Sequence, residues 1–269
     1  MGYKLNLKSP KTLNEKIQWI KLYDRIPLRT KCADKVAVRE YVKEIIGEEY
    51  LVPLVMITED VNDLSYSYLP DKPFIIKTNH DSGGYKIIRD KNEVQDWNKL
   101  RNFFSKRLKT NYFHKSKEWQ YKDIVPKILV EDLLQTKTGN IPEDFKVQCF
   151  NGNPEFIQTD ANRGSREHTR NWYDKNWERA EFVWATKLKT GEETLPSLNE
   201  TPKPSVLEEM LELAEMLSKP FCYARIDFYL LEDKIYFGEI TFSHDSGFRP
   251  VVPFEWDRKL GEMITLPKT

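Results

Sequence analysis

The chain has 269 residues, with 42 Lys and Arg against 42 Asp and Glu, and 39% of its residues are hydrophobic. This length suits one large domain or two small ones with a sizeable core, and the apolar content excludes a disordered chain. Because the charges balance, no overall basic field indicates nucleic acid binding, and no run approaches the roughly 18 apolar residues of a membrane span.

The cysteines and the first residues indicate a cytoplasmic protein. Cys32, Cys149 and Cys222 are odd in number and contain no Cys-x-x-Cys pair, which suits a reducing compartment and disfavours a structural zinc site. Residues 1–8 lack the apolar core of a signal peptide. The four histidines show no metal-ligand spacing, so zinc chemistry is not expected.

The first half of the chain predicts helices followed by strands. Thr12 and Glu15 form a capping box that begins a helix with Ile17 and Ile20 on one face. A second helix is expected from Asp34 to a stop at Gly47. Strands are expected at 51–57, 74–77, 85–88 and 127–134, and an amphipathic helix capped by Asn92 at 93–108.

The second half predicts two hairpins separated by a helix. The hairpins lie at 144–160 and 223–241, the helix opens at Ser205 and ends at Pro220, and residues 161–203 form a looser Trp-rich segment. A short helix at 254–264 closes the chain. Strands joined mostly through hairpins, with helices interspersed, predict an α+β fold with largely antiparallel sheets.

The hairpin at 223–241 carries two facing acids. A turn centred on Asp233 pairs residue 231 with 235, 229 with 237, and Asp227 with Glu239. Alternation then places Arg225, Asp227, Glu239 and Thr241 on one face and Ile226, Phe228, Leu230, Tyr236 and Ile240 on the other. Opposed carboxylates are destabilising without a cation between them, and Mg²⁺ prefers carboxylate oxygens. The alternative is a surface hairpin whose acids are solvated or paired with Arg225.

A glycine-containing loop follows the strand at 74–77. Lys77 ends this strand, and Ser82, Gly83 and Gly84 lead directly into the next one. A P-loop is excluded because Gly-Lys-Ser/Thr and a following helix are both missing. The pattern resembles a flexible flap whose backbone amides approach phosphate oxygens, with the lysine as a point charge. An ordinary turn with a surface lysine is the alternative.

Two further groups of polar residues precede the acidic hairpin. If the 144–160 hairpin turns at Gly152, Lys146 pairs with Gln158 on a polar strand face that is either solvated or functional. That face contains Asp144, Lys146, Gln148, Gln158 and Asp160. Arg163, Arg166 and Arg170 could hold an acidic substrate or form a solvated, salt-bridged loop. Trp172, Trp177 and Trp184 could stack on a sugar, although core packing is the commoner use of tryptophan.

Together these features describe a nucleotide–Mg²⁺ site, and their order resembles a known family. The chain is similar, from residue 13 to 261, to the ATP-grasp superfamily. The resemblance is to its TupA-like proteins, which are linked to teichuronopeptide and bacterial surface-polysaccharide biosynthesis. The residues that carry this resemblance are 33–39, 76–84, 144–146, 225–227 and 237–241.

The resemblance implies one ATP-grasp module, with ATP lying between two α+β subdomains. Its approximate parts are a helical segment at 1–70, a glycine-flap subdomain at 71–135 and a metal- and substrate-binding core at 136–269. Lys77 and the loop with Ser82, Gly83 and Gly84 would close over the phosphates, and Lys146 would lie near the nucleotide. The residues that would flank the adenine, largely through backbone groups, are Lys127, Glu131, Asp132 and Leu133.

The resemblance also implies a metal site in the acidic hairpin. Asp227 and Glu239 would hold Mg²⁺, and Arg225 would face the transferred phosphate. Many superfamily members carry Glu-x-Asn at the second metal strand, whereas this chain has Thr241 after Glu239 and Ile240. A hydroxyl can bind Mg²⁺, so the number of metal ions, one or two, stays open.

The activity implied is an ADP-forming carboxylate–amine ligase with an acyl-phosphate intermediate. Arg225 and Lys77 would be catalytic, and Arg163 and Arg166 would clamp the acceptor or the carboxylate. The substrates would be an amino acid and a uronic acid or amino sugar of a surface glycan, and association with a polysaccharide assembly complex would fit such a pathway. A nucleotide-sugar glycosyltransferase is one alternative, although no Asp-x-Asp motif ends a strand. A binding module that retains the nucleotide cleft without turnover is the other.

Overall fold

The computed structural model describes residues 3–161, 167–188 and 191–268, and its contacts divide the chain into two units. Unit 1 combines Met1–Arg25 with Ile141–Thr269, and unit 2 is the continuous segment Ile26–Asn140. Unit 2 therefore groups residues 26–70 with the predicted flap segment at 71–135.

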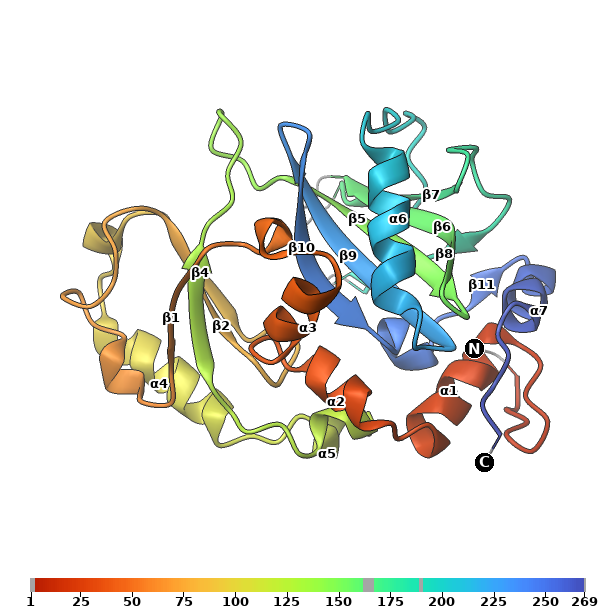
Figure 1. The fold of residues 1–269 in the computed structure, drawn as a ribbon, viewed down its shortest axis with the longest axis horizontal. Helices are drawn as coiled ribbons and strands as arrows, with labels where there is room; N and C mark the ends of the chain where they lie inside the picture. The colour runs from red at the N-terminus through yellow and green to blue at the C-terminus, as the bar shows by residue number, and fades with distance from the viewer. Residues whose placement is uncertain (1–2, 162–166, 189–190, 269) are drawn as a thin grey trace. The chain divides into compact units, whose positions relative to one another are not determined.

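Unit 2 is built on a four-stranded antiparallel sheet in the order β1-β4-β2-β3 (Figure 1). The strands are β1 (Leu54–Thr58), β2 (Phe74–Thr78), β3 (Tyr85–Ile88) and β4 (Ile128–Asp132). Phe74 and Ile76 of β2 pack with Leu100 and Phe104 of the helix α4 (Trp97–Leu108) in one core. The other helices of the unit are α2 (Pro27–Ala33), α3 (Val38–Ile45) and α5 (Phe113–Ser116).

Unit 1 is built on a five-stranded antiparallel sheet in the order β10-β9-β5-β6-β7. The strands are β5 (Glu143–Phe150), β6 (Asn153–Ala161), β7 (Thr169–Asp174), β9 (Tyr223–Leu231) and β10 (Lys234–Thr241), and β8 (Val183–Trp184) pairs with β11 (Val251–Val252). The helix α6 (Leu207–Ser218) runs along β5, β6 and β9 (Figure 1). The helices α1 (Leu13–Tyr23) and α7 (Phe254–Glu262) pack on one another.

The predicted α+β class with antiparallel sheets is confirmed, and so are most of the elements. The helix predicted at 93–108 begins later, at Trp97, because Asp96 rather than Asn92 is its N-cap and accepts a bond from the Lys99 amide. Residues 91–93 form a separate 3-10 turn. The Trp-rich segment contains the unpredicted strand β7. Among the described residues, no helix has the length and apolar character that a membrane crossing requires.

Both hairpins have the predicted central residue pairs, but their turns are shorter than predicted and each contains a β-bulge. The turn between β9 and β10 has only two central residues, Glu232 and Asp233, both with positive φ, so Leu231 pairs with Lys234 rather than with residue 235. A β-bulge at Gly238 then shifts the register by one residue and restores the pairing of Asp227 with Glu239. The β5–β6 hairpin repeats this pattern, since it has a two-residue turn and a bulge, and its predicted Lys146–Gln158 pair is also present.

The bulge also corrects one predicted face. Tyr236 pairs with Tyr229 before the bulge, so it lies on the face of Asp227 and not with the apolar residues. Ile235 and Phe237, both buried, take the apolar positions opposite Leu230 and Phe228.

Candidate active site

The facing acids of β9 and β10 surround an arginine. The Arg225 guanidinium donates to Asp227 through Nε (2.6 Å) and Nη2 (2.7 Å), and Nη2 also lies 3.2 Å from Glu239 Oε1. The same Nη2 donates to the Thr241 hydroxyl at 3.1 Å, and that hydroxyl donates to Glu239 at 3.0 Å. The cation that the opposed carboxylates need is thus supplied by the protein itself, as the alternative interpretation of this hairpin predicted.

Burial sets the protonation of this cluster. Asp227 is 7% exposed, and its burial raises the pKa of its carboxyl to about 6, with Arg225 opposing the shift and Glu239 adding to it. The pKa of Arg225 is raised: burial opposes its charge, but the charge of Asp227 outweighs that effect. Arg225 therefore does not fully offset the cost of burying the Asp227 carboxylate, and a further cation nearby would favour its charged form.

The donor atoms of the cluster fit Mg²⁺. Asp227, Glu239 and Thr241 offer carboxylate and hydroxyl oxygens on one sheet face, which are the ligand types this hard ion prefers. Mg²⁺ commonly uses one or two protein carboxylates and completes its shell with water and phosphate oxygens. Within the described residues, no group of three or more His, Cys, Asp or Glu side chains has metal-site geometry.

A histidine that the sequence did not single out orients the arginine. Arg225 Nη1 lies 3.2 Å from His244 Nδ1, and the 1% exposed imidazole lies against Trp184 with ring centroids 4.0 Å apart. His244 Nε2 lies 3.4 Å from Asp245 Oδ2. Asp245 and Ser246 both have positive φ, and strained residues of this kind concentrate at functional sites.

Burial keeps His244 neutral. It lowers the pKa of the imidazole to about 4, with Asp245 opposing the shift. A neutral ring can accept the Arg225 bond at Nδ1, and this requires its proton to lie on Nε2, toward Asp245. His244 is a single histidine that follows a strand, and no sequence pattern around it indicated its contact with Arg225.

The polar face of β5 and β6 is buried, not solvated. Asp160 accepts bonds from His168 Nε2 and Arg170 Nε, both at 2.9 Å, and lies 3.2 Å from Lys146 Nζ. Lys146 also contacts Asp144 and pairs across the sheet with Asp227. Burial raises the pKa of Asp160, but the His168 bond and the charges of Arg170 and Lys146 outweigh it and hold the pKa well below its usual range. The network therefore extends from the acid cluster to β7.

In unit 2, Lys77 lies in a second charged cluster. Its Nζ is 2.7 Å from Glu131 Oε2, and Arg39 Nη1 is 2.6 Å from Glu131 Oε1. Glu131 is 5% exposed and Lys77 is half-buried on β2. The lysine is therefore held by strand pairing and by a buried carboxylate rather than extended freely into solvent, which fixes the position of its charge.

The loop after Lys77 has a defined shape. Thr78 donates through its amide (2.8 Å) and its hydroxyl (3.1 Å) to the Gly84 carbonyl, closing the loop at its base. A Cβ on Gly84 would lie 1.9 Å from the Thr78 hydroxyl, so only glycine fits there. Gly83 has φ +76° and open space around it, and Ser82 and Gly83 are exposed. Arg107 of α4 holds the loop from one side through Asp81 Oδ2 at 2.6 Å.

The residues expected to flank the adenine lie on or beside β4. Lys127 pairs through its backbone with Asn79 and through its side chain with Glu59 at 3.3 Å. The amides of Asp132 and Leu133 already donate to the carbonyls of Pro53 and Pro73. These amides are thus satisfied within the sheet, which leaves carbonyl groups and side chains for a base.

Other predicted residues are placed as follows. Arg163 and Arg166 lie outside the described residues. Trp172 and Trp184 are buried and stack on each other at 5.5 Å, and Trp177 stacks on Tyr173 at 4.5 Å, so all three serve the packing of unit 1.

A lysine held beside a glycine loop, together with an acid–arginine hairpin, is the arrangement that the resemblance to ATP-grasp proteins led us to expect. The family profile described as TupA-like ATPgrasp matches residues 15–265, so the chain belongs to the TupA-like ATP-grasp family.

Solved structures similar to this chain include ATP-grasp and amino-acid ligases. A D-alanine–D-alanine ligase from Helicobacter pylori has 16% identity and a TM-score of 0.49, with 96% of this chain and 68% of that chain covered. An L-amino acid ligase from Bacillus licheniformis has 14% identity and a TM-score of 0.47, covering 87% and 49%. The ATP-grasp ligase PsnB bound to a minimal precursor has 8% identity and a TM-score of 0.44, covering 81% and 54%. This chain thus spans only about half the length of some neighbours, and a comparison with curated proteins finds no match.

Proposed function

We propose that the protein is an ATP-dependent, Mg²⁺-requiring carboxylate–amine ligase that forms ADP. The observation that carries this proposal is the Arg225 cluster, in which two carboxylates and a hydroxyl surround one guanidinium on a single sheet face. Such a cluster can bind a metal–phosphate group through its oxygens and offset phosphate charge through its arginine.

The residues of unit 1 would act on the transferred phosphate. Asp227, Glu239 and Thr241 would hold Mg²⁺, which when bound neutralises phosphate charge and orients the phosphates. Some of the Arg225 N–H groups, which now donate to the acids, would then donate to the phosphate that leaves ATP. His244 contacts the guanidinium from the side away from the acids, so it would keep the arginine in place during that change.

The residues of unit 2 would also act on ATP. Lys77, fixed by Glu131, would place a positive charge on phosphate oxygens, and the exposed amides of Ser82 and Gly83 would approach them closely. Lys127 and the segment Glu131–Leu133 would contact the base. In unit 1, Lys146 would lie near the nucleotide, because it is the cross-strand neighbour of Asp227.

The reaction would proceed in two steps. A substrate carboxylate oxygen attacks the terminal phosphorus of ATP, the bond to ADP breaks, and an acyl phosphate forms. An amine then attacks the acyl carbon, and inorganic phosphate leaves with the oxygen that came from the carboxylate. A closed loop at residues 81–84 would exclude water and so protect the acyl phosphate from hydrolysis.

For the substrates, we propose an amino acid and a uronic acid or amino sugar of a bacterial surface glycan. The resemblance to proteins of polysaccharide biosynthesis supports this class. As part of the same proposal, the protein would act in the cytoplasm, in association with a polysaccharide assembly complex. Arg163 and Arg166 would clamp the acidic substrate.

The test is incubation of the protein with ATP, Mg²⁺ and a panel of amino acids and acidic or amino sugars. The proposal expects phosphate release that depends on both an acid and an amine, with a new amide detected by mass spectrometry. Consumption of a nucleotide sugar without ATP would instead assign a glycosyltransferase. Nucleotide binding with no turnover across the whole panel would leave only a binding module.

A further inference from the structure

Strand β3 forms an edge of the sheet of unit 2. It pairs only with β2, through Tyr85–Lys77 to Ile88–Phe74, and no other described strand pairs with it. Its side chains are largely exposed, with Tyr85 at 53% and Ile87 at 38%. An edge strand offers a row of backbone donors and acceptors to another extended chain.

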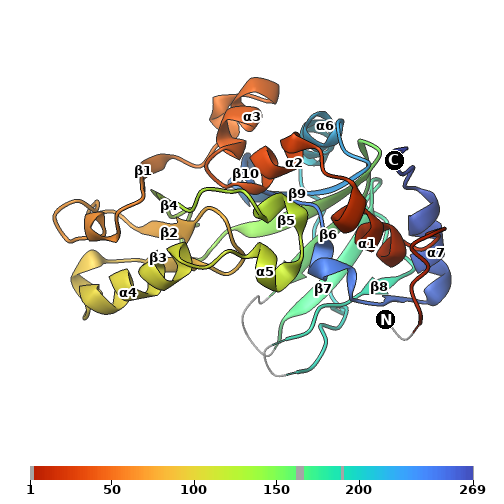
Figure 2. The same cartoon turned by 90° about the horizontal axis from the view of Figure 1, so that it is seen from below.

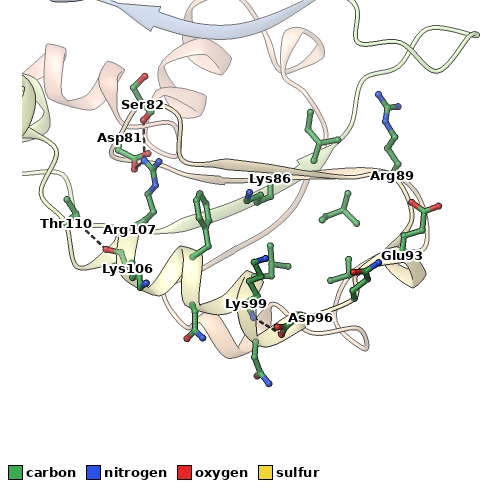
Figure 3. A pocket seen from close by; sticks show the side chains of 18 of the residues that line it. Asp81, Ser82, Lys86, Arg89, Glu93, Asp96, Lys99, Lys106, Arg107 and Thr110 are labelled. Atoms are coloured by element: carbon green, nitrogen blue, oxygen red, sulfur yellow. Dashed lines mark hydrogen bonds and ion pairs between the residues drawn. The ribbon is translucent and has the colours of Figure 1, made fainter. Parts of the chain in front are cut away.

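A groove runs along this edge, and the helix α4 forms its other wall. The groove has a volume of about 1390 Å³ and includes every residue from Lys86 to Asp90 (Figure 3). Figure 2 shows β3 and α4 side by side in this unit. Lys99, Phe103 and Lys106 of α4 line it at helical spacing, while Leu100 and Phe104 help to form the core. An edge strand facing a helix across a groove is a geometry that accepts a peptide as an added strand.

The groove is positively charged. Six cationic side chains from three segments line it: Lys86, Arg89, Lys99, Lys106, Arg107 and Lys115. Arg107 is paired with Asp81 and Arg89 donates to the Gly139 carbonyl, but among the described residues Lys99, Lys106 and Lys115 form no ion pair. These three charges are therefore available to a ligand.

Most acids of the groove are already engaged. Asp81 is buried against Arg107, Asp96 caps α4 by accepting from the Lys99 amide, and Asp90 accepts from the Asn92 amide at 2.8 Å. Because these carboxylates are fixed by local bonds, they do not neutralise the lysines across the groove. Charge complementarity thus selects an anionic occupant.

We propose that the groove between β3 and α4 binds an extended acidic peptide, which adds to β3 as a fifth strand. The peptide backbone pairs with the free edge of β3, and its acidic side chains contact Lys99 and Lys106. The four residues of β3 span about 13 Å, enough to pair with four or five peptide residues. Ser82 lines the groove and is also assigned to ATP, whereas strand β3 and the lysines of α4 are not, so the peptide site goes beyond the proposed function.

Other anions fit the groove less well. A glycan has no row of amides to pair with the strand edge. Single-stranded nucleic acid binds by stacking bases on open aromatic rings, but Lys86 and Arg107 lie over Phe103, at 4.7 and 5.3 Å from its centroid. The edge therefore favours a peptide over either polymer.

The test is fluorescence polarisation with the full chain and a labelled peptide of alternating Glu and Val. A second peptide carries N-methyl groups at its four central amides, which keeps its charge but removes the strand donors. An oligouronate is the third probe. We expect the first peptide to bind, the N-methylated peptide to bind at least about tenfold more weakly, and the amides of residues 85–88 to gain protection from hydrogen exchange.

Charge-reversed variants locate the binding. The Lys99→Glu/Lys106→Glu protein should lose about tenfold in affinity, whereas Lys8→Glu/Lys268→Glu, with the same change in net charge at exposed positions elsewhere, should not. Equal binding of the N-methylated peptide or of the oligouronate would overturn strand addition. Equal loss in both variants would show that binding follows the net charge of the protein and not the groove, and no binding of the first peptide would also overturn the proposal.

Discussion

Asp227 is the residue on which the metal assignment depends. Replacing it by Asn keeps its shape but removes the charge that Arg225 and a cation both need. We expect Asp227→Asn to lower the rate of ATP-dependent turnover by at least about 100-fold, with the circular dichroism spectrum unchanged. The Mg²⁺ dependence of nucleotide binding, measured by calorimetry, should weaken in parallel.

The matched control for this variant is Asp233→Asn in the turn of the same hairpin. This carboxylate is exposed and accepts a bond from Ser205 at 2.6 Å, remote from the arginine. Its variant should keep normal turnover. If Asp227→Asn is as active as the control, the metal assignment is wrong.

The burial of His244 predicts that the stability of the protein depends on pH. Burial lowers its folded pKa to about 4 from the usual 6.5, so the unfolded chain binds a proton between these values and the folded chain does not. The associated stability is complete above pH 6.5 and is lost as the pH falls toward 4, by about 3 kcal/mol in all. Urea unfolding at pH 7.5 and pH 5 should therefore differ. In His244→Gln that difference should shrink, and an unchanged pH dependence would contradict the assignment.

At the scale of elements, the bulge at Gly238 controls the acid pair. A Cβ at this position would lie 2.9 Å from the Asp227 carbonyl oxygen and 3.3 Å from the Tyr229 ring. We expect Gly238→Ala to destabilise the protein by about 1–3 kcal/mol and to reduce turnover, because relief of the contact moves the strand that carries Glu239. Thermal unfolding and turnover are the two measurements.

The contrasting change lies in the turn between β9 and β10, five residues before Gly238. Asp233 has φ +62°, a conformation that glycine adopts without strain. Asp233→Gly should leave the stability within about 1 kcal/mol of the native value and turnover normal. If Asp233→Gly lost as much stability and turnover as Gly238→Ala, the hairpin would be sensitive to any substitution, and the role assigned to the bulge would be contradicted.

The two hairpins also show what a pattern of residues can predict. In these hairpins, the alternation of apolar and polar residues correctly predicted the strands and the pairing of Asp227 with Glu239. The length of the turn and the bulge could not be predicted from this alternation. Each shifts the strand register by one residue, and the two shifts cancel at the Asp227–Glu239 pair. The helix α2 was missed because Ile26 begins it without a side-chain cap, and α4 begins at Asp96 because this aspartate, not Asn92, reaches the helix amides.

At the scale of the whole molecule, the order of short motifs along the chain was enough to identify the family, which matches over residues 15–265. The contacts between the candidate site residues were less predictable. Lys77 was predicted as a point charge beside the glycine loop, but its contact with the buried Glu131 of a distant strand was not predicted. The buried network that joins Lys146 to Asp160 was not predicted either. Contacts of this kind join residues about 15 to 55 positions apart and follow from strand order, which local patterns do not contain.

The central claim is that ATP activates a carboxylate as an acyl phosphate. The most direct measurement uses an acid substrate, such as a uronic acid found active in the panel, labelled with ¹⁸O in its carboxylate. Attack of that carboxylate on ATP, followed by amine attack on the acyl carbon, must leave one ¹⁸O atom in the released phosphate. We predict phosphate with a single ¹⁸O atom by mass spectrometry for every amide formed, and unlabelled phosphate would contradict the account.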